Sequence, residues 1–240
     1  MLSQSVENFI KNIYDLQDEE AWVSTSALAE RLGQKPASVT NMTQKLAKDD
    51  AQLVEYIPYK GVRLNAMGNK VALEIIRHHR LVELYLSQAL GVPWDQVHEE
   101  AEKLEHVISE DLEDRIAAAL GDASRDPHGS PIPTKDGRIE KLDMLPLSDI
   151  PENTGVRVVE VYDHDPPLLR YLGELGLYPG AVFTVLGREE FGSSLRILLD
   201  GKEFRLGGDA IPHISVSILS EAGNRNRKKA RTKNETKRPD

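Results

Sequence analysis

The spacing of hydrophobic and polar positions predicts a helical first half and a strand-rich last third of the chain. Residues 3–18 place apolar side chains at the period of an α-helix. Ser24 or Thr25 can cap a second, short helix that ends at Gly33, and Pro36 suits the first turn of a third helix. Two short helices joined by a turn of about four residues are typical of a helix-turn-helix.

Two short β-prone runs, at residues 53–57 and 61–65, follow and predict a hairpin. A helix-turn-helix followed by a hairpin indicates a winged helix, to which we assign residues 1–70. The exposed side of the third helix and the wing offer hydrogen-bonding and basic groups that can read base edges or contact phosphates. These candidate DNA-contacting residues are Lys35, Ala37, Ser38, Thr40, Asn41, Gln44, Lys45, Tyr59, Lys60 and Arg63. Taken alone, the polar side of the third helix equally suits an ordinary solvated surface.

Helical spacing resumes after the wing. We expect one long helix at about residues 67–90 and helix again from 94 to 120, and we assign residues 71–140 to a helical domain. The apolar stripe of the second segment is wide enough to serve both a domain core and a partner helix. Residues 124–140 are rich in Pro and Gly and indicate an extended loop.

Strand periodicity dominates residues 154–220, for which we predict a small β-barrel. The expected strands are 156–162, 181–189, 194–201, 202–207 and 214–219, with one short helix at about 167–176. Residues 141–153 have the composition of a linker. Residues 221–240 are charged and almost free of apolar groups, which indicates a disordered basic tail.

Composition narrows the classes of protein that remain. The chain has 240 residues, enough for two or three domains, and no cysteine, which excludes disulfides, thiolate metal sites and iron–sulfur clusters. Its net charge is −9, but residues 24–63 are slightly basic and residues 225–238 strongly basic. The acidic balance of the whole chain therefore does not exclude DNA binding by one surface. The first residues do not resemble a signal peptide, and no apolar run approaches the length of a membrane span. We therefore expect a cytoplasmic protein with no membrane partner.

Candidate chemistry is concentrated between His78 and His106, where four of the seven histidines alternate with carboxylates. His79 and Glu83 are four positions apart and share one face of a helix. Four further side chains fall within about a third of the circumference of the next helix. They are His98, Glu102, Glu105 and His106. Facing helices that carry His and Glu are a usual way to build a metal site, and such carboxylates would repel one another without a cation.

Other readings of this cluster stay open. A single His/Glu pair on an amphipathic helix is usually a solvated surface. The run E-x-x-E-H at residues 102–106 is similar to an inverted zinc-protease motif, but Glu102 stands where that motif needs a histidine. The chain contains no Ser/His/Asp arrangement and no glycine-rich phosphate loop, so we do not expect an enzyme, and a metallohydrolase is only a rival hypothesis. The other rival is a winged-helix regulator that responds to a small organic ligand.

The segment VHEEAEKLEHVISEDLEDRI followed by SRDPHGSPIP resembles the metal-dependent repressors of the diphtheria-toxin-repressor and manganese-transport-regulator family. AERLGQKPASVTNMTQKL is similar to their helix-turn-helix, and GVRVVEV and LLRYLGELGLYPGAVFTV to their SH3-like, FeoA-type third domain. The resemblance covers residues 3 to about 220. It implies a mainly α protein with some β structure: a winged helix, a helical metal-binding and dimerisation domain and a small FeoA-type barrel. It also implies a homodimer that binds double-stranded operator DNA and represses genes of metal-ion homeostasis.

The resemblance implies up to two metal sites in each subunit. The primary, activating site would use Asn8, Glu102, Glu105 and His106. The ancillary site would use His79, Glu83 and His98, completed by His164 or Asp165.

Three positions depart from the patterns of the family. Glu102 and Asn8 stand where iron-type members have Cys or Met among their ligands. Asn8 and Lys11 replace an Asp and a Glu common in manganese-type members, and Lys11 would repel a second cation. The remaining oxygen and imidazole ligands suit Mn²⁺, with Fe²⁺ as the alternative.

Overall fold

The computed structural model describes residues 2–17, 22–48, 52–121, 123–162, 164–189 and 193–219. The predicted basic tail lies outside these residues. Two compact units emerge from the contacts within the chain, and each is described by itself. Unit 1 contains Met1–Leu90, Glu99–Ser124 and Pro131–Glu140, and unit 2 contains Gly91–His98, Arg125–Ser130 and the chain from Lys141 onward.

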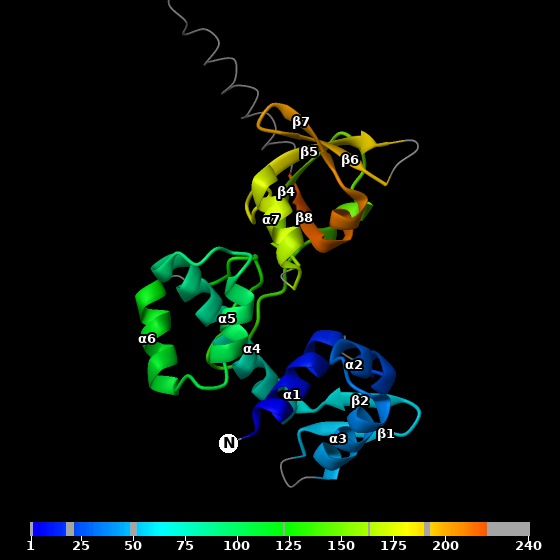
Figure 1. Cartoon of the computed structure of the whole chain (residues 1–240), viewed down its shortest axis with the longest axis vertical. Helices are drawn as coiled ribbons and strands as arrows, with labels where there is room; N and C mark the ends of the chain where they lie inside the picture. The colour runs from blue at the N-terminus through cyan, green and yellow to red at the C-terminus, as the bar shows by residue number, and fades with distance from the viewer. Residues whose placement is uncertain are drawn as a thin grey trace, which may run out of the picture. The chain divides into compact units, whose positions relative to one another are not determined.

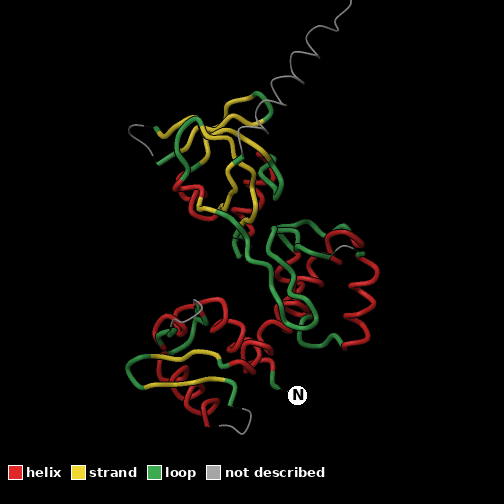
Figure 2. The backbone as a smooth tube through the Cα atoms, turned by 180° about the vertical axis from the view of Figure 1, so that it is seen from behind, coloured by secondary structure: helices red, strands yellow, loops and turns green. Residues whose placement is uncertain are grey.

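The first part of unit 1 is a winged helix (Figures 1 and 2). Its elements are α1 (Gln4–Leu16), α2 (Thr25–Arg31), α3 (Pro36–Lys48), β1 (Val54–Ile57) and β2 (Gly61–Leu64). As predicted, the hydroxyl of Ser24 caps α2 by accepting a hydrogen bond from the backbone N–H of Ala27. The strands β1 and β2 form the predicted antiparallel hairpin. The core beneath them includes Phe9, Ile10, Ile13, Leu28, Val39, Leu46 and Val62.

Three helices make the rest of the helical region: α4 (Ala66–Leu90), α5 (Val97–Leu104) and α6 (Glu110–Leu120). The prediction of continuous helix from 94 to 120 is wrong, because a turn at 105–107 separates α5 from α6. Ser109 starts α6 by accepting a hydrogen bond from the N–H of Leu112, which marks a new helix start. The break matters for function, because it places Glu105 and His106 in the turn.

Within unit 1, α4 packs against both α1 and α6. The predicted extended loop follows α6, and its last part lies along α4. The guanidinium of Arg77 donates a hydrogen bond of 2.7 Å to the carbonyl of Pro133, and Arg80 donates one of 2.6 Å to the carbonyl of Pro131. These two side chains attach the loop to the long helix.

Unit 2 is built on a six-stranded sheet with strand order β3-β8-β4-β5-β6-β7, in which every neighbouring pair is antiparallel. Its elements are β3 (Leu145–Pro146), the 3₁₀ turn η1 (Leu147–Asp149), β4 (Thr154–Val161), α7 (Pro166–Leu175), β5 (Val182–Arg188), β6 (Leu195–Leu199), β7 (Lys202–Leu206), the 3₁₀ turn η2 (Gly208–His213) and β8 (Ile214–Ile218). Leu147 and Ile150, in the segment expected as a linker, are buried in the core of this unit. A two-residue strand and a single turn are too short to produce a recognisable period.

Residues 125–130 also belong to unit 2 and pack against β4. The carbonyl of His128 accepts a hydrogen bond of 2.9 Å from the N–H of Val161, and Nε2 of His128 lies 2.7 Å from the carbonyl of Trp94. A Cβ added to Gly129 would lie 2.0 Å from the carbonyl oxygen of Val159, so only glycine allows this close approach. Among the described helices, none is both long and apolar enough to span a membrane.

Candidate metal centre

The carboxylate of Glu105 lies at the centre of a buried polar cluster in unit 1, and only 2% of the residue is exposed. The ammonium Nζ of Lys11 donates to both oxygens of Glu105, at 3.0 Å and 2.9 Å. Nδ1 of His79 is hydrogen-bonded to Oε2 of the same carboxylate, and Nε2 of His79 lies 2.9 Å from Glu83. The cluster thus joins α1, α4 and the turn after α5.

His106 connects the other side of Glu105 to α1. Its Nε2 lies 2.8 Å from the amide oxygen of Asn8 and 3.2 Å from Oε1 of Glu105. Its Nδ1 lies 2.6 Å from the carboxylate of Glu7. Three of the four residues predicted for the primary site therefore converge. The fourth, Glu102, has a side chain that is 55% exposed, and its carboxylate lies 3.8 Å from Nζ of Lys11.

Sequence reasoning missed Glu7, and it treated Lys11 only as a repelling charge. Glu7 immediately precedes Asn8 in the first turn of α1, where a carboxylate is favoured by the helix dipole whatever its other role. Lys11 is one turn further along the same helix and is buried. A buried lysine is uncommon unless it is paired, and nothing local in the sequence distinguishes it from an exposed one.

Charge pairing shifts the pKa values of the two central groups. Burial alone would lower the pKa of His79, but the charge of Glu83 and the hydrogen bonds to Glu105 and Glu83 outweigh burial and raise it to about 9. Burial likewise would raise the pKa of Glu105, but the hydrogen bond to His79 and the charge of Lys11 hold it below its ordinary value. With no divalent ion bound, Glu105 is an anion between two cations at neutral pH.

The donors beside His106 fit a divalent ion of intermediate hardness. Nε2 of His106, the amide oxygen of Asn8 and the carboxylate of Glu105 converge there, whereas Glu7 contacts Nδ1 on the opposite side of the imidazole ring. The chain has no cysteine, so the soft thiolate donors that select other metals do not occur. Carboxylate, amide and imidazole ligands together are suited to Mn²⁺ and Fe²⁺.

The residues predicted for the ancillary site fall into separate units. His79 and Glu83 contact each other in unit 1. In unit 2, Nδ1 of His164 lies 2.8 Å from Nε2 of His98, with ring centroids 4.3 Å apart. The carboxylate of Asp165 caps α7 by accepting a hydrogen bond from the N–H of Leu168. The ancillary site stays a prediction, and His164 is the third-domain candidate that already contacts a predicted ligand.

A second group of possible ligands lies elsewhere in unit 1. Glu74, His78 and Glu110 each bring one ligand atom to within 4.8 Å of the others. Nε2 of His78 lies 3.3 Å from Glu113, and Nζ of Lys135 lies 3.6 Å from Glu110. Because a lysine already balances part of this acidic cluster, we assign no ion to it.

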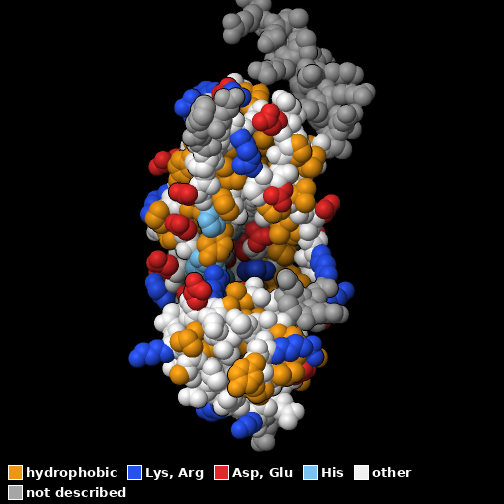
Figure 3. All heavy atoms as spheres, turned by 90° about the vertical axis from the view of Figure 1, so that its right-hand side faces the viewer, with side chains coloured by type: hydrophobic (Ala, Val, Ile, Leu, Met, Phe, Trp, Pro, Cys, Tyr) orange, Lys and Arg blue, Asp and Glu red, His pale blue; other side chains and the backbone are white. Residues whose placement is uncertain are grey.

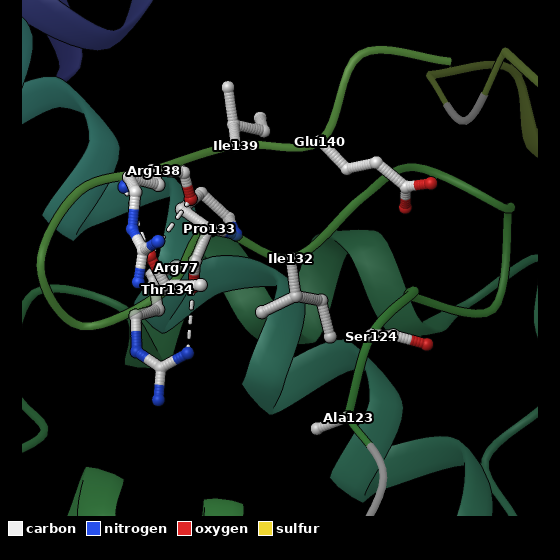
Figure 4. Close-up of a pocket in the computed structure, with 9 residues that line it drawn as sticks. All are labelled: Arg77, Ala123, Ser124, Ile132, Pro133, Thr134, Arg138, Ile139 and Glu140. Carbon is white, nitrogen blue, oxygen red and sulfur yellow. Dashed lines mark hydrogen bonds between the residues drawn. The ribbon is translucent and has the colours of Figure 1, made fainter. Parts of the chain in front are cut away.

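The surface pocket drawn in Figure 4 has a volume of about 470 Å³. It is lined by Arg77, Ala123, Ser124, Ile132, Pro133, Thr134, Arg138, Ile139 and Glu140. Its two arginines are engaged within the protein: Arg77 with Glu113 and the carbonyl of Pro133, and Arg138 with Asp136 at 2.7 Å. Because groups of the protein already bind both arginines, we assign no anionic ligand to this pocket.

The predicted DNA-contacting side of α3 is exposed. Lys35, Ala37, Ser38, Asn41, Gln44 and Lys45 are exposed, whereas Thr40 is half-buried and donates to the carbonyl of Pro36. Val39, Thr43 and Leu46 form the buried opposite side. The winged-helix end, at the bottom of Figure 3, carries mainly Lys and Arg among its charged side chains on the face shown.

In the wing, both predicted phosphate-contacting cations lie against an aromatic ring. Nζ of Lys60 lies 4.4 Å from the ring centroid of Trp22, and Cζ of Arg63 lies 4.8 Å from it. Arg63 also forms an ion pair of 2.8 Å with Glu55. Tyr59, at the tip, is fully exposed. Sequence reasoning missed Trp22, because it precedes α2 and lies far from the wing along the chain.

Comparison with known proteins agrees with this arrangement of domains. Residues 1–62 match the model of the iron-dependent repressor N-terminal DNA-binding domain, residues 65–134 that of the iron-dependent repressor metal-binding and dimerisation domain, and residues 145–218 the FeoA domain. The chain is 31% identical over 196 residues to the iron-dependent repressor IdeR of Mycobacterium leprae, covering 77% of this chain and 84% of that protein.

Solved structures of metal-dependent repressors are also similar to this chain. A manganese-dependent transcriptional repressor in complex with manganese is 36% identical, with a TM-score of 0.81, and covers 89% of this chain and 99% of its own. The IdeR of T. acidophilum is 26% identical, with a TM-score of 0.72, and covers 91% of this chain and 100% of its own. The sequence, the fold and these relatives place the chain in the diphtheria-toxin-repressor and manganese-transport-regulator family of metal-dependent transcriptional repressors, which are DNA-binding proteins and not enzymes.

Proposed function

We propose that the chain is a homodimeric, manganese-responsive repressor of metal-homeostasis genes in the cytoplasm, with Fe²⁺ as the alternative effector. The observation that carries this proposal is the contact of His106 with Asn8 and Glu7 on α1 and with its neighbour Glu105. It joins the first helix of the DNA-binding domain to the turn after α5. A ligand shared by these residues would fix the winged helix relative to the helical domain.

The donor set supports Mn²⁺ as the first candidate. All converging donors are oxygen or imidazole nitrogen, and no thiolate is available in the chain. The relatives do not choose between the metals, because their names include both iron-dependent and manganese-dependent repressors. In a test tube Zn²⁺ would bind such ligands more tightly than Mn²⁺, so the choice depends on geometry and cellular supply.

When bound, the ion would supply two positive charges to a cluster of carboxylates. The positioning of the DNA-binding helices is then done by the protein's own side chains. The exposed Asn8 and the partly buried Glu7 lie on one side of α1, and Phe9, Ile10 and Ile13 extend from the other side into the winged-helix core. Because α1 and α3 contribute to the same core, a ligand that fixes the position of α1 also fixes the position of α3. In a dimer, two recognition helices held in this way match two half-sites of a pseudo-palindromic operator. We expect a coupling of about 1–3 kcal/mol in each subunit, the usual size for allosteric effectors.

The test is DNA binding to the promoter of a metal-uptake gene at fixed salt, with Mn²⁺, anaerobic Fe²⁺, Zn²⁺ or a chelator present. The variant is Glu105→Ala with His106→Ala, and the control is Glu99→Ala with Glu100→Ala on the exposed side of α5. The control should keep metal-stimulated binding, and the variant should lose it. Size-exclusion chromatography with light scattering on the same samples measures the molecular mass and so tests for the dimer.

Equal operator affinity in chelated and metal-loaded wild-type protein would reject metal activation and favour a regulator that responds to a small organic ligand. Metal stimulation that survives in the Glu105/His106 variant would instead show that the activating site lies elsewhere.

A further inference from the structure

Lys11 is a buried cation inside the cluster that we assign to a metal ion. The residue is 8% exposed, although it lies on the amphipathic helix α1. Its Nζ contacts both oxygens of Glu105, at 3.0 Å and 2.9 Å, and lies 3.8 Å from Glu102. It also lies 3.4 Å from Nδ1 of His79. Two of these three residues are predicted ligands of the primary site, and the third belongs to the predicted ancillary set.

Glu105 presents two sides to its surroundings. His79 contacts Oε2 on one side, and His106 lies on the other, 3.2 Å from Oε1. The ammonium of Lys11 contacts both oxygens and lies 3.4 Å from His79, on the side away from His106 Nε2 and Asn8. An ionised carboxylate buried without a counter-charge is strongly unfavourable. The ammonium of Lys11 removes that penalty when no divalent ion is present, and Glu83 does the same for His79.

We propose that Lys11 is an internal cation that permanently occupies the His79 side of Glu105. The cluster then accepts a single divalent ion, on the side of Asn8 and Nε2 of His106, and Lys11 weakens the affinity for that ion. This inference rests on the proposed function and concerns the number of ions and the concentration at which the site responds. The physical reason is like-charge repulsion: an ammonium within hydrogen-bond reach of Glu105 opposes a second cation on the same carboxylate.

The test compares Lys11→Met with Lys70→Met, a matched change at an exposed lysine of α4. Both are made in a His98→Ala background, so that the predicted ancillary site does not contribute to the count of ions. Three quantities are measured: the melting temperature with chelator, the dissociation constant for Mn²⁺ by titration calorimetry, and the Mn²⁺ content by elemental analysis.

We expect Lys11→Met to melt at a lower temperature than Lys70→Met in chelator and to bind Mn²⁺ about tenfold more tightly, which corresponds to about 1.4 kcal/mol. Its Mn²⁺ content should stay at one ion per subunit. Lys11→Glu should bind one more Mn²⁺ per subunit, because it replaces the internal cation with a ligand. Lys11→Arg keeps the positive charge and should keep the affinity for Mn²⁺ close to that of the protein with Lys11.

Equal melting temperatures and equal Mn²⁺ affinities in the two Lys→Met variants would overturn the inference. A second Mn²⁺ in the presence of an unaltered Lys11 would also overturn it. Mn²⁺ binding that is insensitive to His106→Ala would refute the assigned position of the ion, and equal operator affinity with Mn²⁺ and with chelator would refute the proposed function. In both cases the melting temperatures in chelator would still decide whether Lys11 neutralises Glu105.

Discussion

His79 and Glu105 show how much a buried residue depends on its partners. The imidazole of His79 is held between two carboxylates, and this raises its pKa to about 9 from an ordinary 6.5. A raised pKa means that the protonated histidine stabilises the folded state. That contribution is complete below pH 6.5 and is lost as the pH rises through about 9.

We therefore predict that chelated protein becomes less stable between pH 6.5 and 9, because the proton on His79 is lost from the folded state. The measurement is the free energy of unfolding by urea across this range, with His79→Gln for comparison. The variant should have a flatter profile. Parallel profiles for the two proteins would mean that other groups cause the dependence on pH.

Glu7 is a further residue to which its contacts assign a testable role. Its carboxylate lies 2.6 Å from Nδ1 of His106 and so orients the ring that faces Asn8 and Glu105. Residues that orient a ligand typically contribute 10–100-fold to metal affinity. We expect Glu7→Gln to weaken Mn²⁺ binding by about tenfold or more in titration calorimetry, with Glu99→Gln as the control. Unchanged affinity would remove Glu7 from the site.

At the scale of elements, local periodicity predicts neither the contact that Trp22 makes with the wing nor the break after α5. Trp22 lies against the hairpin and holds Lys60 and Arg63 over its ring. At exposed sites a cation–π contact contributes about 0.5–1 kcal/mol. The aromatic ring thus orders two cations that would otherwise sample many rotamers.

We predict that Trp22→Leu weakens operator binding by about two- to fivefold at fixed salt, as expected when a contact of this strength is lost. The reason is that the wing cations must then be ordered during binding. Fluorescence anisotropy with labelled operator at several salt concentrations measures the effect, and Lys70→Met serves as a control outside the wing. An operator affinity equal to that of wild type would limit Trp22 to a role in folding.

The turn after α5 illustrates why helix length was overestimated. The apolar positions on both sides continue at nearly the same spacing, so the period alone does not reveal a break. The sequence did contain one signal of a new helix start: Ser109 is a capping residue, and acidic residues follow it in the first turn of α6. The break brings Glu105 and His106 off the helix, towards α1.

At the scale of the whole molecule, the proposed mechanism couples two ligands through one conformational equilibrium. Binding free energies coupled in this way are reciprocal. If Mn²⁺ increases operator affinity by a given factor, operator DNA must increase Mn²⁺ affinity by the same factor, within the usual range of about 5–150-fold.

This reciprocity can be measured by titrating Mn²⁺ into the dimer with and without saturating operator. We expect tighter Mn²⁺ binding with operator and no change with a scrambled duplex. The same Mn²⁺ affinity in all three samples would show that metal and DNA bind independently.

The sequence by itself determined the order of most helices and strands, the helix-turn-helix with its hairpin, and most of the residues of the candidate metal centre. These follow from periodicity, capping residues and the spacing of His and Glu, which act over a few residues. The tertiary structure decided which of those side chains meet. Glu7 and Lys11 join Glu105 and His106 from almost a hundred positions away, and Trp22 joins the wing from the other side of the helix-turn-helix. Burial and charge pairing depend on neighbours in space, and local sequence patterns do not contain that information.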